Sequence, residues 1–326
     1  MTTFIHHGCN LEIDPFIKEA SDEDFSVKIP GVKPNIAQES ILDENGRTYA
    51  GYKRDTYFLP NDAEEQARLD FQHEMYLQVT GGRLGIAPVE SPQYCLDAAT
   101  GTGIWAVQYA QKYPNCQVIG SDLSLIQREK LTPNCQFIQQ DLEKEEWKFE
   151  HQFDHIHFRY VVTCFDDMPA IIKKAYDCLK PGGWIEFYDT EPVIIPLDDT
   201  VHGTAVEQWC KLIIQGALAA GRDVLKPEKY AKWCAEAGLV NVTEKRFPLP
   251  NNGIWPKDPT MKKMGRYSMK IQTSLVDSLT KFIRLAGLSA EETAIFEAQV
   301  KENLRDPKIH YFKEVFMIYA QKPLDE

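Results

Sequence analysis

Hydrophobic and polar positions alternate in blocks between residues 91 and 195. Two segments, 104–110 and 168–179, have apolar side chains three or four positions apart, which is the spacing of helices that bury one face. Between them lie short apolar runs, which are typical of strands buried on both faces of a sheet. Alternating strands and helices predict an α/β fold with a mostly parallel sheet and helices on both faces. The five predicted strands lie at 94–96, 117–120, 133–140, 153–158 and 184–188.

The pattern changes after residue 195, where helices dominate. We expect the last two strands to pair antiparallel at the sheet edge, which brings the sheet to seven strands. The helices inserted between these strands are interpreted as a lid over an acceptor pocket, and their composition fits a dimer interface equally well. The predicted elements are helices at 201–221, 226–238, 261–286 and 290–303, and strands at 240–247 and 311–321.

The residues before the sheet divide into an arm and a helix. The arm is polar and interrupted by prolines, which predicts weak order until about Tyr49. Asn61 or Asp62 can cap a helix that two glycines end, and its apolar stripe is interpreted as core packing. The stripe consists of Ala67, Phe71, Met75 and Val79. The expected organisation is an arm (1–50), a helical extension (51–90), the sheet core (91–195) and a C-terminal part with the inserted lid (196–326).

The candidate chemistry is concentrated in one strand–loop–helix unit, from Tyr94 to Asp122. Its small-residue loop contains Gly101 and Gly103, which let the backbone approach a ligand, and the following helix N-terminus directs N–H groups at it. The Asp122 carboxylate, after the second strand, can accept both hydroxyls of a ribose. These features indicate a nucleoside ligand. No Gly-Lys-Ser/Thr follows the glycines, which excludes a P-loop, whereas a dinucleotide site stays open.

A charged residue follows each of the first five predicted strands. Because ligands bind beyond the carboxyl ends of parallel strands, we expect these side chains to converge on one cleft. They are Asp97, Asp122, Asp141, Arg159 and Asp189.

Two sets of motifs carry a resemblance to known families. Asp97 before Gly101-x-Gly103, then Gln140-Asp141-Leu142 and Leu179 to Glu186, resembles the class I S-adenosylmethionine (SAM)-dependent methyltransferases. A narrower similarity, to the fungal LaeA-like methyltransferases of secondary metabolism, extends from about Tyr57 to Pro323. Its motifs include Tyr57-x-Leu59-Pro60-Asn61-Asp62, Thr102-Gly103-Ile104-Trp105-Ala106, Phe153-Asp154-x-Ile156-His157-x-Arg159-Tyr160, Trp255-Pro256-Lys257-Asp258 and Ile309-His310-Tyr311.

The resemblance implies a Rossmann-like fold with SAM as cofactor. It places Asp97 near the methionine part of SAM, Asp122 on the ribose and Asp141 near the adenine. Arg159 is expected to touch the methionyl carboxylate or the acceptor, or to form a salt bridge within the fold. The expected cofactor-binding residues are Asp97, Ala99, Thr100, Gly101, Gly103, Asp122, Leu123, Asp141, Leu142 and Arg159.

Position 99 departs from the family, which usually has glycine there. If the backbone needs a positive φ at Ala99, or if SAM lies against its Cα, the added Cβ costs about 1 kcal/mol. The departure has two interpretations: weaker SAM binding, or a pocket that no longer transfers methyl groups.

The sequence offers few candidate catalytic side chains. Methyl transfer from a sulfonium needs aligned reactants and exclusion of water, and a base only where the acceptor must lose a proton. His73 and His310 are the candidate bases, and a hydrogen-bonded structural role is the alternative for each. Tyr57 and Tyr160 are candidate walls of the acceptor pocket.

The inferred function is methyl transfer from SAM to a small-molecule acceptor of secondary metabolism. Two alternatives stay open. One is a pericyclase-like isomerase on the methyltransferase scaffold, and the other is a regulatory protein whose arm before Tyr49 contacts partners.

Composition limits the partners and the compartment. A chain of 326 residues, 43% of them hydrophobic, is long enough to bury a full core. The formal net charge of −12 argues against unaided binding to nucleic acid or an anionic membrane, which leaves a small molecule, a protein partner or a homodimer. Eight scattered cysteines and no secretory signal indicate reduced thiols in a cytosolic or nuclear protein. The cluster His6, His7 and Cys9 is not expected to bind a metal.

Overall fold

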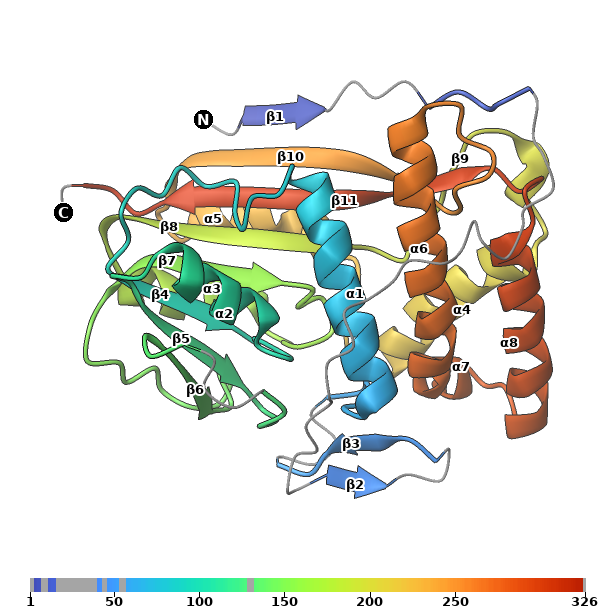
Figure 1. Ribbon diagram of the computed structural model, residues 1–326. Coiled ribbons are helices and arrows are strands. Elements are labelled where there is room, and N and C mark those ends of the chain that lie inside the picture. The colour runs from blue at the N-terminus through green and yellow to red at the C-terminus, as the bar shows by residue number, and fades with distance from the viewer. Residues whose placement is uncertain are drawn as a thin grey trace.

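A twisted, mostly parallel sheet runs through the centre of the protein (Figure 1). The computed structural model describes residues 3–6, 11–15, 40–42, 46–52, 57–127 and 132–324. The strand order is β1-β10-β11-β8-β7-β4-β5-β6, and β9 pairs with β11 beside this path. The strands are β1 (Thr3–His6), β4 (Tyr94–Ala98), β5 (Gln117–Asp122), β6 (Cys135–Gln139), β7 (Phe153–Arg159), β8 (Leu179–Thr190), β9 (Ile195–Pro196), β10 (Val240–Pro250) and β11 (Tyr311–Gln321).

The chain order of the strands reverses at β4. β5 and β6 continue in parallel on one side of β4, and β7 and β8 on the other. Ligands of open parallel sheets bind at the carboxyl ends beside such a reversal. β11 runs antiparallel between β8 and β10, so the predicted antiparallel pairing of the last two strands is confirmed. The seven predicted strands are all present, and β1 and β9 extend the sheet.

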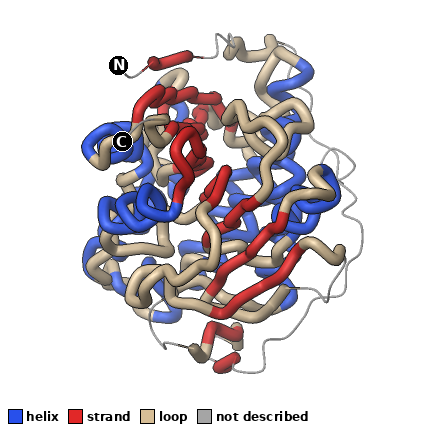
Figure 2. Tube along the Cα trace, turned by 90° about the vertical axis from the view of Figure 1, so that its left-hand side faces the viewer, coloured by secondary structure: helices blue, strands red, loops and turns tan. Residues whose placement is uncertain are grey.

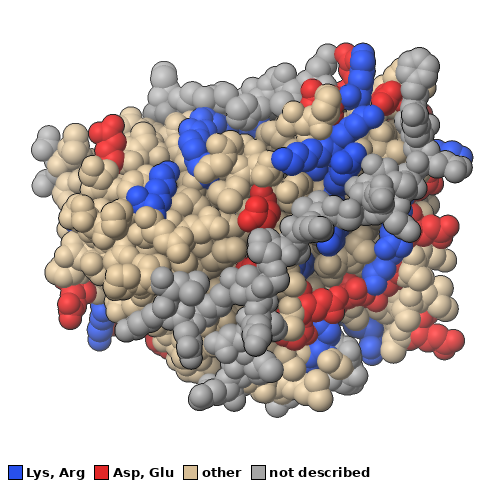
Figure 3. All heavy atoms as spheres, viewed as in Figure 1, with Lys and Arg blue, Asp and Glu red and all other residues tan. Residues whose placement is uncertain are grey.

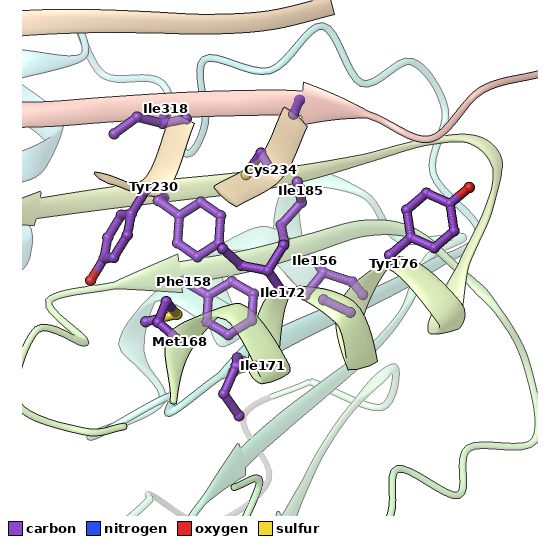
Figure 4. Packing of buried hydrophobic residues seen from close by; sticks show 14 of the residues in the cluster. Ile156, Phe158, Met168, Ile171, Ile172, Tyr176, Ile185, Tyr230, Cys234 and Ile318 are labelled. Atoms are coloured by element: carbon purple, nitrogen blue, oxygen red, sulfur yellow. The ribbon is translucent and has the colours of Figure 1, made fainter. Parts of the chain in front are cut away.

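Helices cover both faces of the sheet, as the view along another direction also shows (Figure 2). On one face, α3 (Met168–Cys178) and α5 (Tyr230–Glu236) bury apolar side chains against β7 and β8. Figure 4 shows Ile171 and Ile172 of α3 near Phe158 of β7. On the other face, a second core is formed with the alternate strand positions by α1 (Ala63–Val79), α2 (Ile104–Lys112) and α6 (Pro259–Ser278). This alternation is the two-sided burial that the apolar runs predict.

The helix before the sheet, α1 (Ala63–Val79), is buried on more than its apolar stripe. The Asp62 side chain accepts the Glu65 N–H at 3.0 Å, so Asp62 is the N-cap of the two candidates. Phe71 and Met75 are buried as predicted, but Ala67 is exposed. α1 contacts both α2 and α6, so polar positions beside the stripe are covered as well. The buried polar residues are Glu65, Gln66, Arg68, Asp70, Gln72 and His73.

The helices inserted between the last two strands, which were interpreted as a lid, form a layer beside the sheet together with α4 (Figure 1). α4 (Ala205–Ala219) and α7 (Thr280–Leu285) cross closely, because a Cβ added at Gly216 would lie 1.8 Å from the Phe282 carbonyl oxygen. α6 (Pro259–Ser278) and α8 (Ala290–Arg305) complete a third apolar core with them. The single helix predicted over 261–286 is wrong, since Leu279 ends α6 and begins α7.

Three short strands lie in the region expected to be a weakly ordered arm. β1 pairs in parallel with β10, because a sheet edge offers N–H and C=O groups that another strand can satisfy. β2 (Ser40–Leu42) and β3 (Thr48–Ala50) form an antiparallel pair. The other residues of the arm, apart from 11–15 and 46–47, lie outside the described part of the chain. They include His7 and Cys9, which were not expected to bind a metal.

The surface and the thiols agree with the composition. Figure 3 shows basic and acidic side chains interspersed on one face. Seven cysteines fall within the described residues, and all seven are free thiols. Of the helices in those residues, none is long and apolar enough to cross a lipid bilayer.

Candidate functional site

The loop between β4 and α2 contains three residues with left-handed backbone. φ is +56° at Ala99, +58° at Gly101 and +75° at Gly103, so the conformation that favours glycine also occurs at the alanine. Gly103 is the N-cap of α2, and a Cβ there would lie 2.5 Å from the ring of Phe137. Packing against Phe137 therefore leaves no room for a side chain at position 103. At position 99, the left-handed backbone strains the alanine by about 1 kcal/mol.

A cavity opens above this loop at the carboxyl ends of β4, β5 and β7, and we call it the glycine-loop cavity. Nine of the ten residues expected to bind a cofactor line it, and Gly103 does not because it lies behind the loop, at the start of α2. The nine are Asp97, Ala99, Thr100, Gly101, Asp122, Leu123, Asp141, Leu142 and Arg159.

Asp97 anchors the loop from below. Its carboxylate accepts the Thr100 hydroxyl at 2.5 Å and contacts His157 Nδ1 at 2.9 Å. Burial lowers the pKa of His157, against the opposing effect of Asp97, so the ring is neutral and donates from Nδ1. Trp105 stacks on this ring with 3.7 Å between centroids. Asp97 is thus held in place by partners inside the protein at the floor of the glycine-loop cavity.

Asp122 presents a carboxylate to the same cavity from the end of β5. It accepts the Gly101 N–H at 2.8 Å and the Ser124 N–H at 2.9 Å. A carboxylate has about four acceptor positions, so these backbone hydrogen bonds do not use all of them and a hydroxyl group can still donate to Asp122. Burial, the largest effect, raises the pKa of Asp122 to about 6 despite the backbone hydrogen bonds. The side chain is therefore ionised near neutral pH.

The third strand-end acid, Asp141, lies in an apolar part of the cavity wall. Its Oδ1 accepts the N–H groups of Glu143 and Lys144, at 3.1 and 3.0 Å. The neighbouring cavity wall is formed by apolar side chains, namely Leu123, Ile126, Leu142 and Phe165. A flat heterocycle with an exocyclic amino group matches this combination of apolar walls and one acceptor.

Arg159 lines the cavity from the end of β7, and His73 of α1 lies behind it. Arg159 Nη1 donates to His73 Nδ1 at 2.5 Å, and His73 Nε2 lies 3.0 Å from Gln108 Oε1. Burial, with a smaller contribution from the Arg159 cation, lowers the pKa of His73 to about 3. The ring is neutral, has both nitrogens engaged and is absent from the lining of the two cavities described here.

His310, the other candidate base, also lies away from both cavities. Its Nδ1 is 2.7 Å from Asp198 Oδ2 and its Nε2 is 3.1 Å from the Pro307 carbonyl oxygen. Its backbone N–H donates to Thr200, so it fixes the connection that enters β11. The structure gives neither histidine access to the cavities, and it supports the alternative of a structural role.

A second cavity adjoins the first and lies under the lid helices, and we call it the lid cavity. Tyr57, Leu69 and Tyr160 line both cavities, so the two tyrosines expected to form the acceptor wall are at their boundary. Tyr160 has φ of +54°, a strained value for a bulky residue that is common at functional sites. Most other walls are apolar side chains from α1, α4, α6 and α7, such as Met75, Ile213, Ile271, Leu275 and Phe282.

Polar residues of the lid cavity come from α1 and from the end of β8. Arg68 of α1 forms a buried ion pair with Glu65 at 2.7 Å and donates to Gln72 at 2.8 Å. Asp189, which was expected to join the other strand-end charges in one cleft, lines the lid cavity instead of the glycine-loop cavity, and Glu191 lines it as well. Burial raises the pKa of each of these two carboxyls to about 7. The only signal for the α1 residues was their spacing of three and four positions, which places them on one helix face.

The residues of the glycine-loop cavity suit the parts of SAM. A buried carboxylate with acceptor positions left, Asp122, matches a ribose diol, and the apolar wall with Asp141 matches an adenine. The left-handed loop and the Arg159 cation match the methionyl part. With the strand order of the sheet, these features define a class I SAM-dependent methyltransferase, and SAM is its cofactor.

Comparisons with known proteins identify the family. The family described as "Methyltransferase domain" matches residues 71–244. Methyltransferase pytC of Aspergillus terreus is 34% identical, covering 86% of this chain and 87% of its own. Secondary metabolism regulator LAE1 of Cochliobolus heterostrophus is 33% identical over 89% and 97%, and protein-methionine methyltransferase laeA of Emericella nidulans is 30% identical over 90% and 80%. The chain belongs to this methyltransferase family and, within it, to the LaeA-like fungal proteins of secondary metabolism.

Proposed function

We propose that the protein transfers a methyl group from SAM to a small-molecule acceptor bound in the lid cavity. The observation that carries this proposal is the contact between the two cavities, which share Tyr57, Leu69 and Tyr160. A donor site and a mostly apolar site that meet at a common wall suit a transfer between two bound small molecules.

The chain's own residues bind and orient the two reactants in this proposal. Asp122 accepts the ribose hydroxyls, Asp141 accepts from the adenine, and Arg159 attracts the methionyl carboxylate. SAM supplies an electrophilic methyl group on a sulfonium. The lid helices and α1 exclude water from the boundary, where Tyr57 and Tyr160 orient the acceptor.

Two acids are better placed than the histidines to receive a proton from the acceptor. Asp189 and Glu191 line the lid cavity, whereas neither His73 nor His310 does. A pKa of about 7 suits a general base near neutral pH. We expect Glu191→Gln to lower turnover and to remove one limb of the pH–rate profile, while a variant at His310 leaves that profile unchanged.

Calorimetric titration with S-adenosylhomocysteine tests the donor site. Asp122→Ala should weaken binding by at least about tenfold, because it removes hydrogen bonds to a charged acceptor. Asp177→Ala, at an exposed acid of α3, is the matched control and should bind as the parent does. Equal affinity of the parent and Asp122→Ala would remove the ribose assignment.

The mass of the product tests the reaction. Incubation with methyl-labelled SAM and extracts of secondary metabolites should yield a labelled small molecule. A product of unchanged mass would instead favour the isomerase alternative, since an isomerisation adds no methyl group.

The second candidate function is regulation of secondary metabolism. It is favoured by the similarity to LAE1, whose name is that of a regulator, over 89% of this chain. Deletion of residues 1–45 separates the two candidates. Loss of partner binding with turnover preserved would support regulation through the arm, and unchanged partner binding would count against it.

A further inference from the structure

The lid cavity contains a buried hydrogen-bond donor that the described residues do not satisfy. Trp209 of α4 is 1% exposed and its ring lines this cavity. Within the described part of the chain, its indole Nε1 has no hydrogen-bond partner. Leaving a buried N–H unpaired costs about 1 to 3 kcal/mol, so an oxygen of a bound molecule would stabilise it.

A cation lies beside this indole. Lys313 of β11 lines the lid cavity, and its Nζ is 5.2 Å from the centroid of the Trp209 ring. A cation over a ring face leaves the in-plane N–H uncovered, so this contact does not satisfy Nε1. Lys313 also interacts with the Cys210 thiol. Burial raises the pKa of this thiol more than Lys313 lowers it, so the thiol is neutral and does not balance the charge of Lys313.

The charge of Lys313 is not balanced by the acids of the same cavity. Lys313 forms no ion pair with a carboxylate of the described residues, whereas Arg68, the other cation of the lining, is paired with Glu65. Asp189 lies opposite Phe316 in the sheet register, three positions from Lys313. Because alternate residues of a strand point to opposite faces, Lys313 and Asp189 project from different faces of the sheet.

We propose that the acceptor carries an anionic oxygen, such as a carboxylate or an enolate, on an otherwise apolar body. The Lys313 ammonium attracts the charge, and the Trp209 indole N–H donates to the oxygen. Leu249, Ile213 and other apolar walls contact the body. Neither Lys313 nor Trp209 lines the glycine-loop cavity, so this oxygen is distinct from the atom that meets the methyl donor at Tyr57 and Tyr160.

This inference rests on the proposed function only in naming the occupant an acceptor, so its test needs no SAM. The probes are 2-naphthoate and its neutral methyl ester, titrated calorimetrically into the full chain with and without S-adenosylhomocysteine. The two probes have nearly the same apolar body and differ in charge. We expect the parent to bind the carboxylate at least about tenfold more tightly than the ester.

Four variants separate charge from packing. Lys313→Met should abolish the preference and leave the affinity for the ester unchanged, whereas Lys313→Arg should keep the preference. Trp209→Phe should weaken both probes by about fivefold, because each has an oxygen that accepts the indole N–H. Lys308→Met is the control, because Lys308 is an exposed lysine just before β11, and this variant should behave as the parent does. In the parent, the indole N–H resonance that Trp209→Phe removes should shift on addition of 2-naphthoate.

Other outcomes overturn the proposal. Equal affinity of the parent for the acid and the ester, a preference that survives Lys313→Met, or binding of neither probe would each contradict an anion site here. A failure of SAM binding in the donor-site titration would leave these results intact, so the two proposals fail independently.

Discussion

Ala99 has a backbone conformation that suits glycine, so Ala99→Gly tests whether the loop is strained. At φ of +56°, the Cβ of an L residue approaches the backbone at a cost of about 1 to 2 kcal/mol. Glycine removes this cost but increases the entropy of the unfolded chain, worth about 0.5 to 1 kcal/mol. It also removes a partly buried methyl group, worth about 0.4 kcal/mol. These effects nearly cancel, so the unfolding free energy should stay within about 0.5 kcal/mol of the parent.

Ala98→Gly is the matched control one residue earlier. Ala98 is fully buried at the end of β4 and is absent from the residues with positive φ. Its replacement loses a methyl group and adds unfolded-state entropy without relieving strain, which costs about 1.5 kcal/mol. Urea unfolding followed by circular dichroism measures both variants. Equal destabilisation by the two substitutions would refute the claim that Ala99 is strained.

The same variant separates strain from ligand contact at position 99. Relief of backbone strain at position 99 acts on folding, and it changes binding only where the backbone differs between the free and the bound protein. We therefore expect S-adenosylhomocysteine to bind Ala99→Gly within about twofold of the parent. A gain of about tenfold would mean that the Ala99 Cβ obstructs the ligand.

The remaining predictions concern three residues, Asp122, Gly216 and Glu65. The pKa of Asp122 is raised to about 6. The affinity for S-adenosylhomocysteine, measured by calorimetric titration, should therefore be constant above about pH 7 and fall about tenfold per pH unit below about pH 6. Asp122→Asn should remove this pH dependence. Between pH 4 and 6 the folded state binds the extra proton, so the unfolding free energy of the parent should fall with rising pH relative to Asp122→Asn. Gly216→Ala would place a Cβ 1.8 Å from a backbone oxygen of α7 and should destabilise by about 2 to 3 kcal/mol in urea unfolding; an unchanged midpoint would contradict the close α4–α7 crossing. Glu65→Gln leaves the buried Arg68 cation unpaired and should cost about 3 to 5 kcal/mol in thermal unfolding, with exposed Glu64→Gln as the neutral control.

The ligand end of the sheet was predictable because it depends on backbone order. Strands buried on both faces have a clear apolar signature, and their carboxyl ends lie together whatever the side chains are. Asp97, Asp122 and Asp141 accordingly line one cavity. The antiparallel pairing of β10 with β11 followed from the same pattern.

The polar interior was not predictable, because its burial depends on partners distant in the sequence. His155 and His157 occupy alternate positions of β7 and are buried against Trp105, with Asp97 and Glu186 as acidic neighbours. The sequence pattern shows that such positions are polar, but it does not identify the distant residues that form hydrogen bonds with them. For the same reason the candidate bases were chosen by residue type, and the structure places both histidines away from the cavities.

The two cavities come from parts of the chain that can diverge separately. The family match covers residues 71–244, which includes the strand ends with Asp97, Asp122, Asp141 and Arg159, and it ends before α6. The helices α6 and α7, which supply much of the lid cavity, form an insertion between β10 and β11. Under the proposed function, substitutions in this insertion would alter acceptor choice without disturbing the parallel strands that position the donor. New acceptor specificities would then arise, by natural drift or by grafting the insertion, on an unchanged donor-binding half.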